Sequence, residues 1–344
     1  MTNRVLIVGA GAIGGVAAAH LTRAGQDVVA LDANVEHTTL LRTRGLILEE
    51  PDGTTSTIHI NAVNDVADLE GRFDFALITL KSLAIQSAIG PLVAHDLVDV
   101  YVSFGNGLVQ DVVGSIVGND RLIIGLLEWG ATNLGPGHLR QTTEGAMVVG
   151  EIDGSRTQRL ERLQVILSDV MATSKISSAI GGQVWSKLLL NSTFSGLGAV
   201  GGCVYRDVAA DPIGREVAFR LWTEGYDIAI ALGMELGPVF GMSPAKLVVR
   251  GDGPWPAADQ ALDKLMIGAG ATKASMLQDL ERSLKTEVDV INGGVVAAAQ
   301  RIGRKAPLNS ELTRIVHEYE SGRGEPSRDA FARLMEVNCN VVIS

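Results

Sequence analysis

The sequence is poor in the residues that build several classes of protein. It has two cysteines in 344 residues, Cys203 and Cys339, and they lie far apart in the chain. Such usage fits a reducing compartment and argues against a disulfide framework and a thiolate metal site. The six histidines are scattered, with no pair at the spacing by which a helix presents two metal ligands. The sequence therefore predicts no metal site.

Basic charge is also scarce. Lys and Arg number 29 against 39 Asp and Glu, which gives a net charge of −10 with no run of basic residues. A nucleic acid or an anionic membrane surface is therefore not an expected partner. Hydrophobic residues make up 46% of the chain and charged residues 20%, as in packed globular proteins. Since the length exceeds the size at which one core stops growing, two domains are expected.

Two uncharged stretches resemble export or membrane segments. Residues 5–22 contain Gly9, Gly11, Gly14 and Gly15, at a phosphate-binding spacing that the apolar region of a signal peptide has no reason to contain. Residues 188–205 contain several polar side chains and four glycines, so they are not a membrane span. The sequence predicts a cytoplasmic protein without membrane association.

Strand and helix patterns alternate in the first half of the chain. The expected strands are residues 4–8, 27–31, 75–80, 99–104, 122–127 and 146–152, and the expected helices are 12–24 and 83–93. Repeated alternation of this kind predicts a parallel sheet covered by helices on both faces. Short strands within 50–60 are expected to extend this sheet, and residues 130–137 to form a loop.

The first strand and the first helix are joined by Gly9-Ala10-Gly11-Ala12-Ile13-Gly14. In this context Gly9 permits a tight turn, Gly11 lets the backbone approach a pyrophosphate, and Gly14 lets helix and strand pack closely. The helix N-terminus, which begins with Ala12 and Ile13, faces the negative charge of the ligand. The pattern predicts a dinucleotide site, and a glycine-rich turn without a ligand is the alternative.

Asp32 ends the second strand, 18 positions after Gly14. A carboxylate there accepts hydrogen bonds from the ribose hydroxyls of the adenosine half and repels a 2′-phosphate. Residues 33–36 supply no Arg or Lys that would accommodate NADP. NAD is therefore the expected cofactor, and a surface aspartate in a turn is the alternative.

From about residue 183 the pattern becomes helical. The expected helices are 185–197, 212–232, 243–250, 275–300 and 309–321. Ser and Gly cluster at 178–182, where we expect the domain boundary. The sequence thus predicts an α/β protein with a Rossmann-type dinucleotide-binding domain at 1–180 and a mostly helical substrate and catalytic domain at 181–344. The apolar helices of the second domain suggest a homodimer.

Four polar residues of the helical half are candidate site residues. Lys187 and Asn191 lie four positions apart and share one helix face. Ser275 and Glu287 lie twelve positions apart, which brings them close in azimuth if residues 275–300 form one helix. By residue type alone, each is more often a solvated side chain than a catalytic one.

Taken together, these motifs resemble the ketopantoate reductase family over essentially the whole chain. The resemblance rests on the glycine turn, Lys81, Asn106-Gly107, Gly135-Pro136-Gly137, Lys187 with Asn191, residues 273–279 and 286–293, and Pro307 with Asn309. It implies an NAD(P)-dependent oxidoreductase that transfers a hydride between nicotinamide and a small 2-oxo or 2-hydroxy acid, with 2-dehydropantoate foremost.

The resemblance also implies a role for each site residue. Lys187 would be the general acid and base and a substrate contact, and Glu287 its polar partner. The remaining implied contacts are Asn106, Asn191, Ser195 and Ser275 to the substrate, and Lys81, Asn106 and Glu287 to the cofactor. A positioned ammonium group is the type of donor that can protonate the alkoxide left by hydride addition.

Three residues depart from the family pattern. Asp32 replaces the basic environment expected for NADPH, and Ser195 and Thr272 stand where the family often has asparagine. An NAD-dependent dehydrogenase of another D-2-hydroxy acid, or of an aryl or sugar-derived alcohol, is therefore an alternative. A non-catalytic dinucleotide-binding regulator is disfavoured because Lys187, Ser275 and Glu287 are all present.

Overall fold

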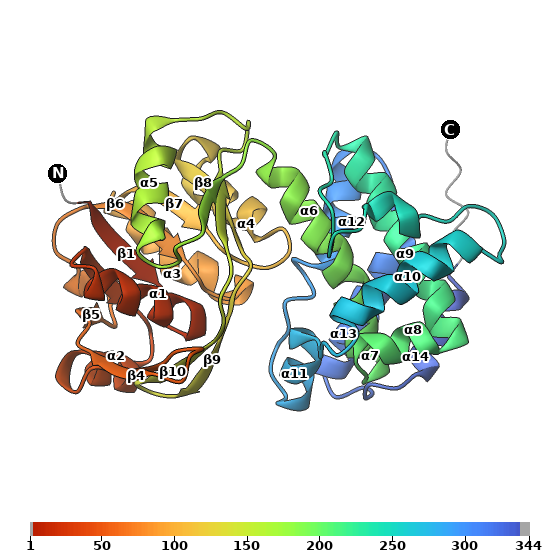
Figure 1. Cartoon of the computed structure of the whole chain (residues 1–344), viewed down its shortest axis with the longest axis horizontal. Coiled ribbons are helices and arrows are strands. Elements are labelled where there is room, and N and C mark those ends of the chain that lie inside the picture. The colour runs from red at the N-terminus through yellow and green to blue at the C-terminus, as the bar shows by residue number, and fades with distance from the viewer. Residues whose placement is uncertain (1–2, 338–344) are drawn as a thin grey trace. The chain divides into compact units, whose positions relative to one another are not determined.

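The computed structural model describes residues 3–337 of the chain (Figure 1), and they form two compact units. The N-terminal unit holds the residues up to Gly105 together with Val109–Ile180. The C-terminal unit holds Asn106–Leu108 and the residues from Gly181 onward. Cys203 is a free, buried thiol, and Cys339 lies outside the described residues. Within the described part, no helix is both long and apolar enough to cross a membrane.

The N-terminal unit is built on an eight-stranded sheet in the order β12-β11-β8-β7-β6-β1-β2-β5. The strands are β1 (Arg4–Val8), β2 (Asp27–Leu31), β5 (Ala62–Val63), β6 (Phe73–Ile78), β7 (Val98–Ser103), β8 (Leu122–Leu127), β11 (Met147–Gly150) and β12 (Ser174–Ile176). Neighbouring strands run parallel except β8 and β11. Residues 5–8 of β1 are at most 1% exposed, as expected for a strand covered on both faces. The predicted parallel α/β sheet is confirmed.

The described part of this unit has five α-helices: α1 (Ala12–Arg23), α2 (Val35–Thr43), α3 (Ser82–Ala94), α4 (Val109–Val117) and α5 (Gln158–Ser168). Two of them begin at a side-chain cap, because Asn34 accepts a hydrogen bond from the His37 N–H and Thr157 accepts one from the Leu160 N–H. Short 3-10 helices at Val66–Asp68 and Asn119–Arg121 complete the unit.

A second sheet of four strands in the order β4-β3-β10-β9 corrects two of the sequence predictions. Its strands are β3 (Leu46–Glu49), β4 (Thr55–Ile58), β9 (Gly130–Gly135) and β10 (His138–Thr143). The strands within 50–60 do not extend the main sheet, and residues 130–137 are largely a strand, so both expectations were wrong. Positive φ values at Gly135 and Gly137 form the β9–β10 turn, and the fully buried Leu139 packs against Gly15 of α1.

The C-terminal unit is helical, as predicted. Its helices are α6 (Ile180–Leu190), a π-helix (Asn191–Ser195), α7 (Gly196–Gly201), α8 (Tyr205–Ala210), α9 (Pro212–Ala231), a 3-10 helix (Pro244–Leu247), α10 (Pro256–Ala269), α11 (Ser275–Glu281), α12 (Asn292–Arg301), α13 (Pro307–Glu320) and α14 (Asp329–Met335). Proline opens α9, α10 and α13, where its missing N–H costs nothing. The core includes the fully buried Trp222, with Phe194 and Phe331 each 1% exposed.

The expected single helix over residues 275–300 was wrong. Helix α11 ends at Glu281 and α12 begins at Asn292, so Glu287 lies in a non-helical segment and does not share a helix with Ser275. The physical reason is a tertiary hydrogen bond, because the Thr286 N–H donates to the Glu320 carboxylate at 2.7 Å instead of to a carbonyl four residues earlier. The expected helix at 243–250 is likewise reduced to one 3-10 turn.

Candidate active site

The glycine turn after β1 has the geometry of a dinucleotide site. A Cβ on Gly14 would lie 2.0 Å from the Gly9 carbonyl oxygen, and one on Gly9, whose φ is +93°, would lie 2.5 Å from the Leu80 side chain. A Cβ on Gly11 would meet nothing within 4 Å. Among the described residues no side chain caps the N-terminus of α1, and its first turn contains no acidic residue. Open space beside uncapped N–H groups fits a pyrophosphate.

The neighbouring strands place two further predicted residues at the same edge of the sheet. The turn at Gly9 follows β1, which is flanked by β2 and β6, so the turn lies at the switch point where open α/β sheets bind ligands. Asp32 follows β2, is half-buried, and accepts a hydrogen bond from the Asn34 N–H at 2.9 Å. Lys81 follows β6 as the exposed first residue before α3. Parallel strands thus bring the three positions to one edge.

His37 contacts the glycine turn, and the sequence analysis did not predict this contact. It is buried on α2, with Nε2 2.8 Å from the Ala10 carbonyl oxygen and Nδ1 2.9 Å from the Gly137 nitrogen. Because the Gly137 N–H donates to Nδ1, the proton resides on Nε2 and is donated to Ala10. His37 therefore joins the glycine turn to the β9–β10 turn. The partners are 27 and 100 positions away, so no local pattern reveals this link.

In the C-terminal unit, Lys187 and Asn191 lie at a change of helix type. Lys187 is half-buried near the end of α6, and Asn191 opens the π-helix. Such π-turns are rare and occur frequently at functional sites. Ser195 closes the π-helix, with Oγ 3.5 Å from Asn191 Oδ1 and 2.5 Å from the Tyr205 hydroxyl. Burial raises the pKa of Tyr205, so this hydroxyl stays protonated. Tyr205 was not among the predicted residues.

A buried polar network holds the π-helix. The Asn292 side-chain amide donates to the Ser192 carbonyl at 2.8 Å and to Asn309 Oδ1 at 2.9 Å. Asn309 in turn donates to Glu224 through its backbone N–H and its side chain, both at 2.9 Å. Burial raises the pKa of Glu224 despite these hydrogen bonds. The resemblance included Asn309, but nothing in the sequence pattern marked Glu224.

Asn106 and Glu287 come together although they are 181 positions apart. The Asn106 amide nitrogen lies 3.4 Å from Glu287 Oε2, and Glu287 is 8% exposed. The Leu108 N–H donates to the Val290 carbonyl at 2.8 Å, and a Cβ on Gly107 would lie 2.2 Å from the same oxygen. Glycine with φ of +66° is therefore required for the tripeptide to approach the segment that carries Glu287.

Ser275 lies elsewhere in the same unit. It is exposed in the first turn of α11, and α11 packs against the π-helix and α7. The helix that begins with Ser275 therefore packs against the π-helix that carries Asn191 and Ser195, whereas Glu287 lies in a separate non-helical segment. Within residues 3–337, no three His, Cys, Asp or Glu side chains gather into a group that could hold a metal ion.

The protein is a nicotinamide-dependent oxidoreductase of the class that acts on CH–OH groups. Residues 5–154 match the family described as "Ketopantoate reductase PanE/ApbA", and residues 179–320 match the family described as "Ketopantoate reductase PanE/ApbA C terminal". This protein belongs to the ketopantoate reductase family.

Similar proteins cover more than nine-tenths of the chain. A 2-dehydropantoate 2-reductase of Pyrococcus horikoshii is 27% identical over 92% of this chain and 98% of its own length. One of Mesorhizobium japonicum is 28% identical over 93% and 99%. Among solved structures, a D-mandelate dehydrogenase with NADH and anilino(oxo)acetate has a TM-score of 0.76 at 21% identity, covering 93% of this chain and 99% of that one. A PanE/ApbA family ketopantoate reductase from Ralstonia eutropha has a TM-score of 0.77 at 24% identity, with coverage of 93% and 99%.

Replacement of Asn106 by alanine is expected to lower kcat/KM about tenfold, since a lost hydrogen bond to a charged group costs about 1.5 kcal/mol. The melting temperature should be retained because Asn106 is half-buried and Leu108 still pairs with Val290. Steady-state kinetics and thermal melting of Asn106→Ala check this, with the exposed Asn61→Ala as the matched control. An unchanged kcat/KM would remove Asn106 from the site.

Proposed function

We propose that this protein catalyses hydride transfer between NAD and a small 2-oxo or 2-hydroxy acid, with 2-dehydropantoate as the first candidate substrate. The observation that carries the proposal is the approach of Asn106 to Glu287 within a unit that also contains Lys187. The curated relatives named 2-dehydropantoate 2-reductase match nearly their full length to this chain, which supports the choice of substrate.

In this proposal Lys187 is the general acid and base. A bound dinucleotide would supply the hydride for reduction, and the Lys187 ammonium donates the proton that the resulting alkoxide needs. In the reverse reaction the neutral Lys187 amine removes the hydroxyl proton, and the dinucleotide would accept the hydride. The same positive charge stabilises the developing alkoxide and attracts the substrate carboxylate. Glu287, which lies next to Asn106, orients the Lys187 ammonium group. Asn191, Ser195 and Ser275 fix the substrate by hydrogen bonds, so that its carbonyl is presented in one orientation.

A second candidate is an NAD-dependent dehydrogenase of another D-2-hydroxy acid. Two observations favour it: the carboxylate of Asp32 at the end of β2, and the Ser195 hydroxyl bonded to Tyr205 at 2.5 Å. A hydroxyl that is occupied by a tyrosine has less capacity to bind a polar substrate tail than the asparagine common in the family. The structural neighbour named D-mandelate dehydrogenase carries NADH and an aryl 2-oxo acid derivative, which agrees with this candidate.

A steady-state screen separates the two candidates. Reduction of 2-dehydropantoate and of a series of 2-oxo acids, including phenylglyoxylate, is measured with NADH and with NADPH, and the matching alcohols are tested in reverse. The first candidate predicts the highest kcat/KM with 2-dehydropantoate, and the second predicts it with another 2-oxo acid. Absence of turnover with every substrate, in the presence of tight cofactor binding, would instead favour a dinucleotide-binding regulator.

The wild-type protein is expected to bind NADH at least about tenfold more tightly than NADPH, a difference of ~1.4 kcal/mol. Asp32 would lose its ribose hydrogen bonds and meet a phosphate dianion if the cofactor carried a 2′-phosphate. Arg42 and Arg44 are the next basic residues after Asp32, ten and twelve positions further on, and they are exposed in the last turn and at the end of α2. We therefore do not expect them to accommodate a 2′-phosphate. Titration of both cofactors against wild type and Asp32→Ala tests the assignment. Equal affinities in the wild type, or no gain for NADPH in the variant, would contradict it.

We also propose a cytoplasmic homodimer formed through the helical unit. Ile267 on α10 is 87% exposed, and Phe240, whose ring a Cβ on Gly268 would approach within 3.3 Å, is 63% exposed. Exposed apolar side chains of this size are unfavourable in water and favour association. Sedimentation equilibrium of the wild type and of Ile267→Asp distinguishes a dimer from a monomer.

A further inference from the structure

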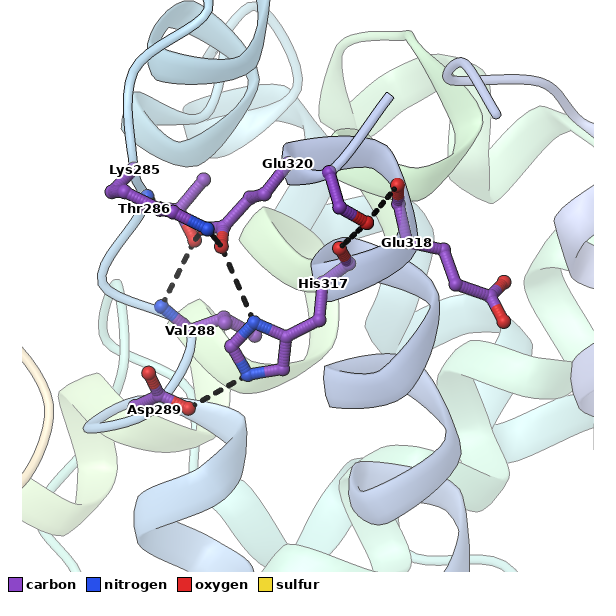
Figure 2. A network of polar contacts seen from close by, with 8 residues as sticks. Lys285, Thr286, Val288, Asp289, His317, Glu318 and Glu320 are labelled. Atoms are coloured by element: carbon purple, nitrogen blue, oxygen red, sulfur yellow. Dashed lines mark hydrogen bonds and ion pairs between the residues drawn. The ribbon is translucent and has the colours of Figure 1, made fainter. Parts of the chain in front are cut away.

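Glu320 is a buried carboxylate that accepts two hydrogen bonds from Thr286, the residue immediately before Glu287. It ends α13 and its side chain is 3% exposed. Its Oε1 accepts hydrogen bonds from the Thr286 backbone N–H at 2.7 Å and from the Thr286 hydroxyl at 2.8 Å. Its Oε2 lies 3.1 Å from Lys285 Nζ and 3.2 Å from His317 Nδ1 (Figure 2). One side chain of α13 therefore determines where the backbone enters position 287.

The backbone after Glu287 is held as well. The Val288 N–H donates to the Thr286 hydroxyl at 3.2 Å, so this hydroxyl joins the residues on either side of Glu287 (Figure 2). His317 Nε2 lies 2.9 Å from Asp289 Oδ1, two residues further along. The Glu287 carbonyl accepts hydrogen bonds from the N–H groups of Val290 and Ile291 at 3.2 and 3.1 Å. A non-helical segment thus acquires a single backbone path through contacts that mostly converge on one end of α13.

We propose that Glu320 and His317 are positioning residues of the active site, which fix the segment 285–289 so that the Glu287 carboxylate is presented in its productive place. The proposal rests on the proposed function, in which Glu287 orients Lys187. A displacement of about 1 Å at a reacting group can cost roughly a hundredfold in rate. Loss of the Glu320 carboxylate would also leave the Thr286 N–H without its buried acceptor, which destabilises the segment.

The charges around Glu320 keep it ionised. Burial alone would raise the pKa of Glu320, but hydrogen bonds from the Thr286 N–H, the Thr286 hydroxyl, Lys285 and His317 outweigh it and lower the pKa overall. A carboxyl whose pKa is lowered by folding stabilises the protein above its unfolded pKa, and this contribution is lost as the pH falls through the folded pKa. The acceptor for Thr286 is therefore fully charged at neutral pH.

The number of contacts that His317 makes with Glu320 and Asp289 depends on the protonation of its ring. A charged imidazolium donates to Asp289 and to Glu320 together, whereas a neutral ring has one N–H and serves only one of them. The charged groups that face the ring are Asp289 and Glu320, and Lys285 binds the same Glu320 oxygen, Oε2, as His317 does. On the same helix, Arg314 is paired with Glu311 and Glu318, and so is Arg333 of α14. Deprotonation of His317 thus removes one of the two contacts.

The test compares three replacements by steady-state kinetics and thermal melting. Glu320→Ala is expected to lower kcat about tenfold or more, with the Kd for NADH unchanged. Glu320→Gln retains an amide oxygen for both Thr286 donors and should restore kcat to within about twofold of wild type. Glu318→Ala is the matched control, because Glu318 lies two residues away on α13 and binds Arg314 and Arg333 instead of the 285–289 segment. It should lose melting temperature without losing kcat.

The dependence of kcat on pH tests the role of His317, because a purely structural role of Glu320 would not change this dependence. In the wild type, kcat should fall as a rise in pH converts the His317 imidazolium to the neutral ring, because only the imidazolium donates to both Asp289 and Glu320. In Glu320→Gln the amide NH₂ donates to the unprotonated Nδ1 while Nε2–H donates to Asp289, so neutral His317 keeps both contacts. The kcat of this variant should therefore rise over the same range, because the imidazolium Nδ1–H faces an amide NH₂ that cannot accept a hydrogen bond. A wild-type and a Glu320→Gln profile that coincide would overturn the role of His317.

The outcomes separate this proposal from the proposed function. If Glu287→Ala retains wild-type kcat, the proposed function fails. If Glu287→Ala is impaired while Glu320→Ala retains kcat, the positioning role fails. If Glu320→Ala and Glu318→Ala lose kcat in proportion to melting temperature, Glu320 is only structural. Should Glu320→Ala not fold, Thr286→Val, which removes one of the two Thr286 donors, must lower kcat for the proposal to stand.

Discussion

Replacement of Lys187 by alanine is expected to lower kcat for 2-oxo acid reduction by roughly a hundredfold or more, because the alkoxide then takes its proton from water. Cofactor binding should be unaffected, since the dinucleotide turn belongs to the N-terminal unit. Pre-steady-state and steady-state rates with NADH, together with Kd for NADH, check both parts. Lys187 is half-buried near the C-terminal end of α6, so removal of its side chain should not unfold the protein.

Two further variants sharpen this test. Lys187→Arg retains the positive charge but not a readily transferred proton, because guanidinium remains protonated in proteins. It should preserve KM for the acid while kcat stays low. The exposed Lys264→Ala on α10 is the matched control and should behave as wild type. A Lys187→Ala enzyme that turns over at near wild-type rate would show that another group donates the proton.

A pair of glycine substitutions should separate the architectural from the ligand-facing part of the dinucleotide turn. In Gly14→Ala the new Cβ would lie 2.0 Å from the Gly9 carbonyl oxygen and 2.3 Å from Thr79 Oγ1, and backbone cannot yield at such distances. This overpacking is expected to cost about 1 to 3 kcal/mol. The melting temperature of the cofactor-free protein should therefore fall by several degrees, and NADH binding should be lost with the shape of the turn.

In Gly11→Ala the new Cβ meets open space, so the cofactor-free protein should melt as wild type does. The methyl group stands where the pyrophosphate approaches the backbone, and the Kd for NADH should rise about tenfold or more. Differential scanning calorimetry and fluorescence titration of both variants measure the contrast. If Gly11→Ala leaves NADH affinity unchanged, the pyrophosphate does not lie against this turn. A stable Gly14→Ala would show that the strand and helix can separate.

Local sequence patterns predicted the elements that local interactions determine. The apolar run of β1 and the glycine turn of α1 were predictable because each follows from burial and turn chemistry within about twenty residues. The same holds for the helical spacing of Lys187 and Asn191. The path of the chain at Glu287 was not predictable, because a hydrogen bond from Thr286 to Glu320, 34 positions away, overrides helix propensity.

The remaining errors have the same cause. Strands β9 and β10 form a local antiparallel pair, but their place in the second sheet depends on the parallel pairing of β10 with β3, some 90 residues earlier, a partner that the local sequence does not specify. His37 was one of six scattered histidines until the fold placed it between Ala10 and Gly137. Glu224 lay within an expected helix and Tyr205 lay between two expected helices, and no pattern marked either residue. Their roles arise from contacts across the unit, and residue spacing carries no record of such contacts.

The tripeptide Asn106–Leu108 affects both the folding of the chain during synthesis and its expression as two separate fragments. Residues before and after it complete the N-terminal unit, yet its own contacts lie in the C-terminal unit. On the ribosome, the Leu108 N–H remains without its partner until Val290 has been synthesised, about 180 residues later. A gene cut at residue 180 would leave the second fragment without Asn106 beside Glu287. Expression of the two units as separate proteins should therefore give a helical fragment that regains the Asn106 contact only when the first fragment, or a peptide spanning residues 105–109, is added back.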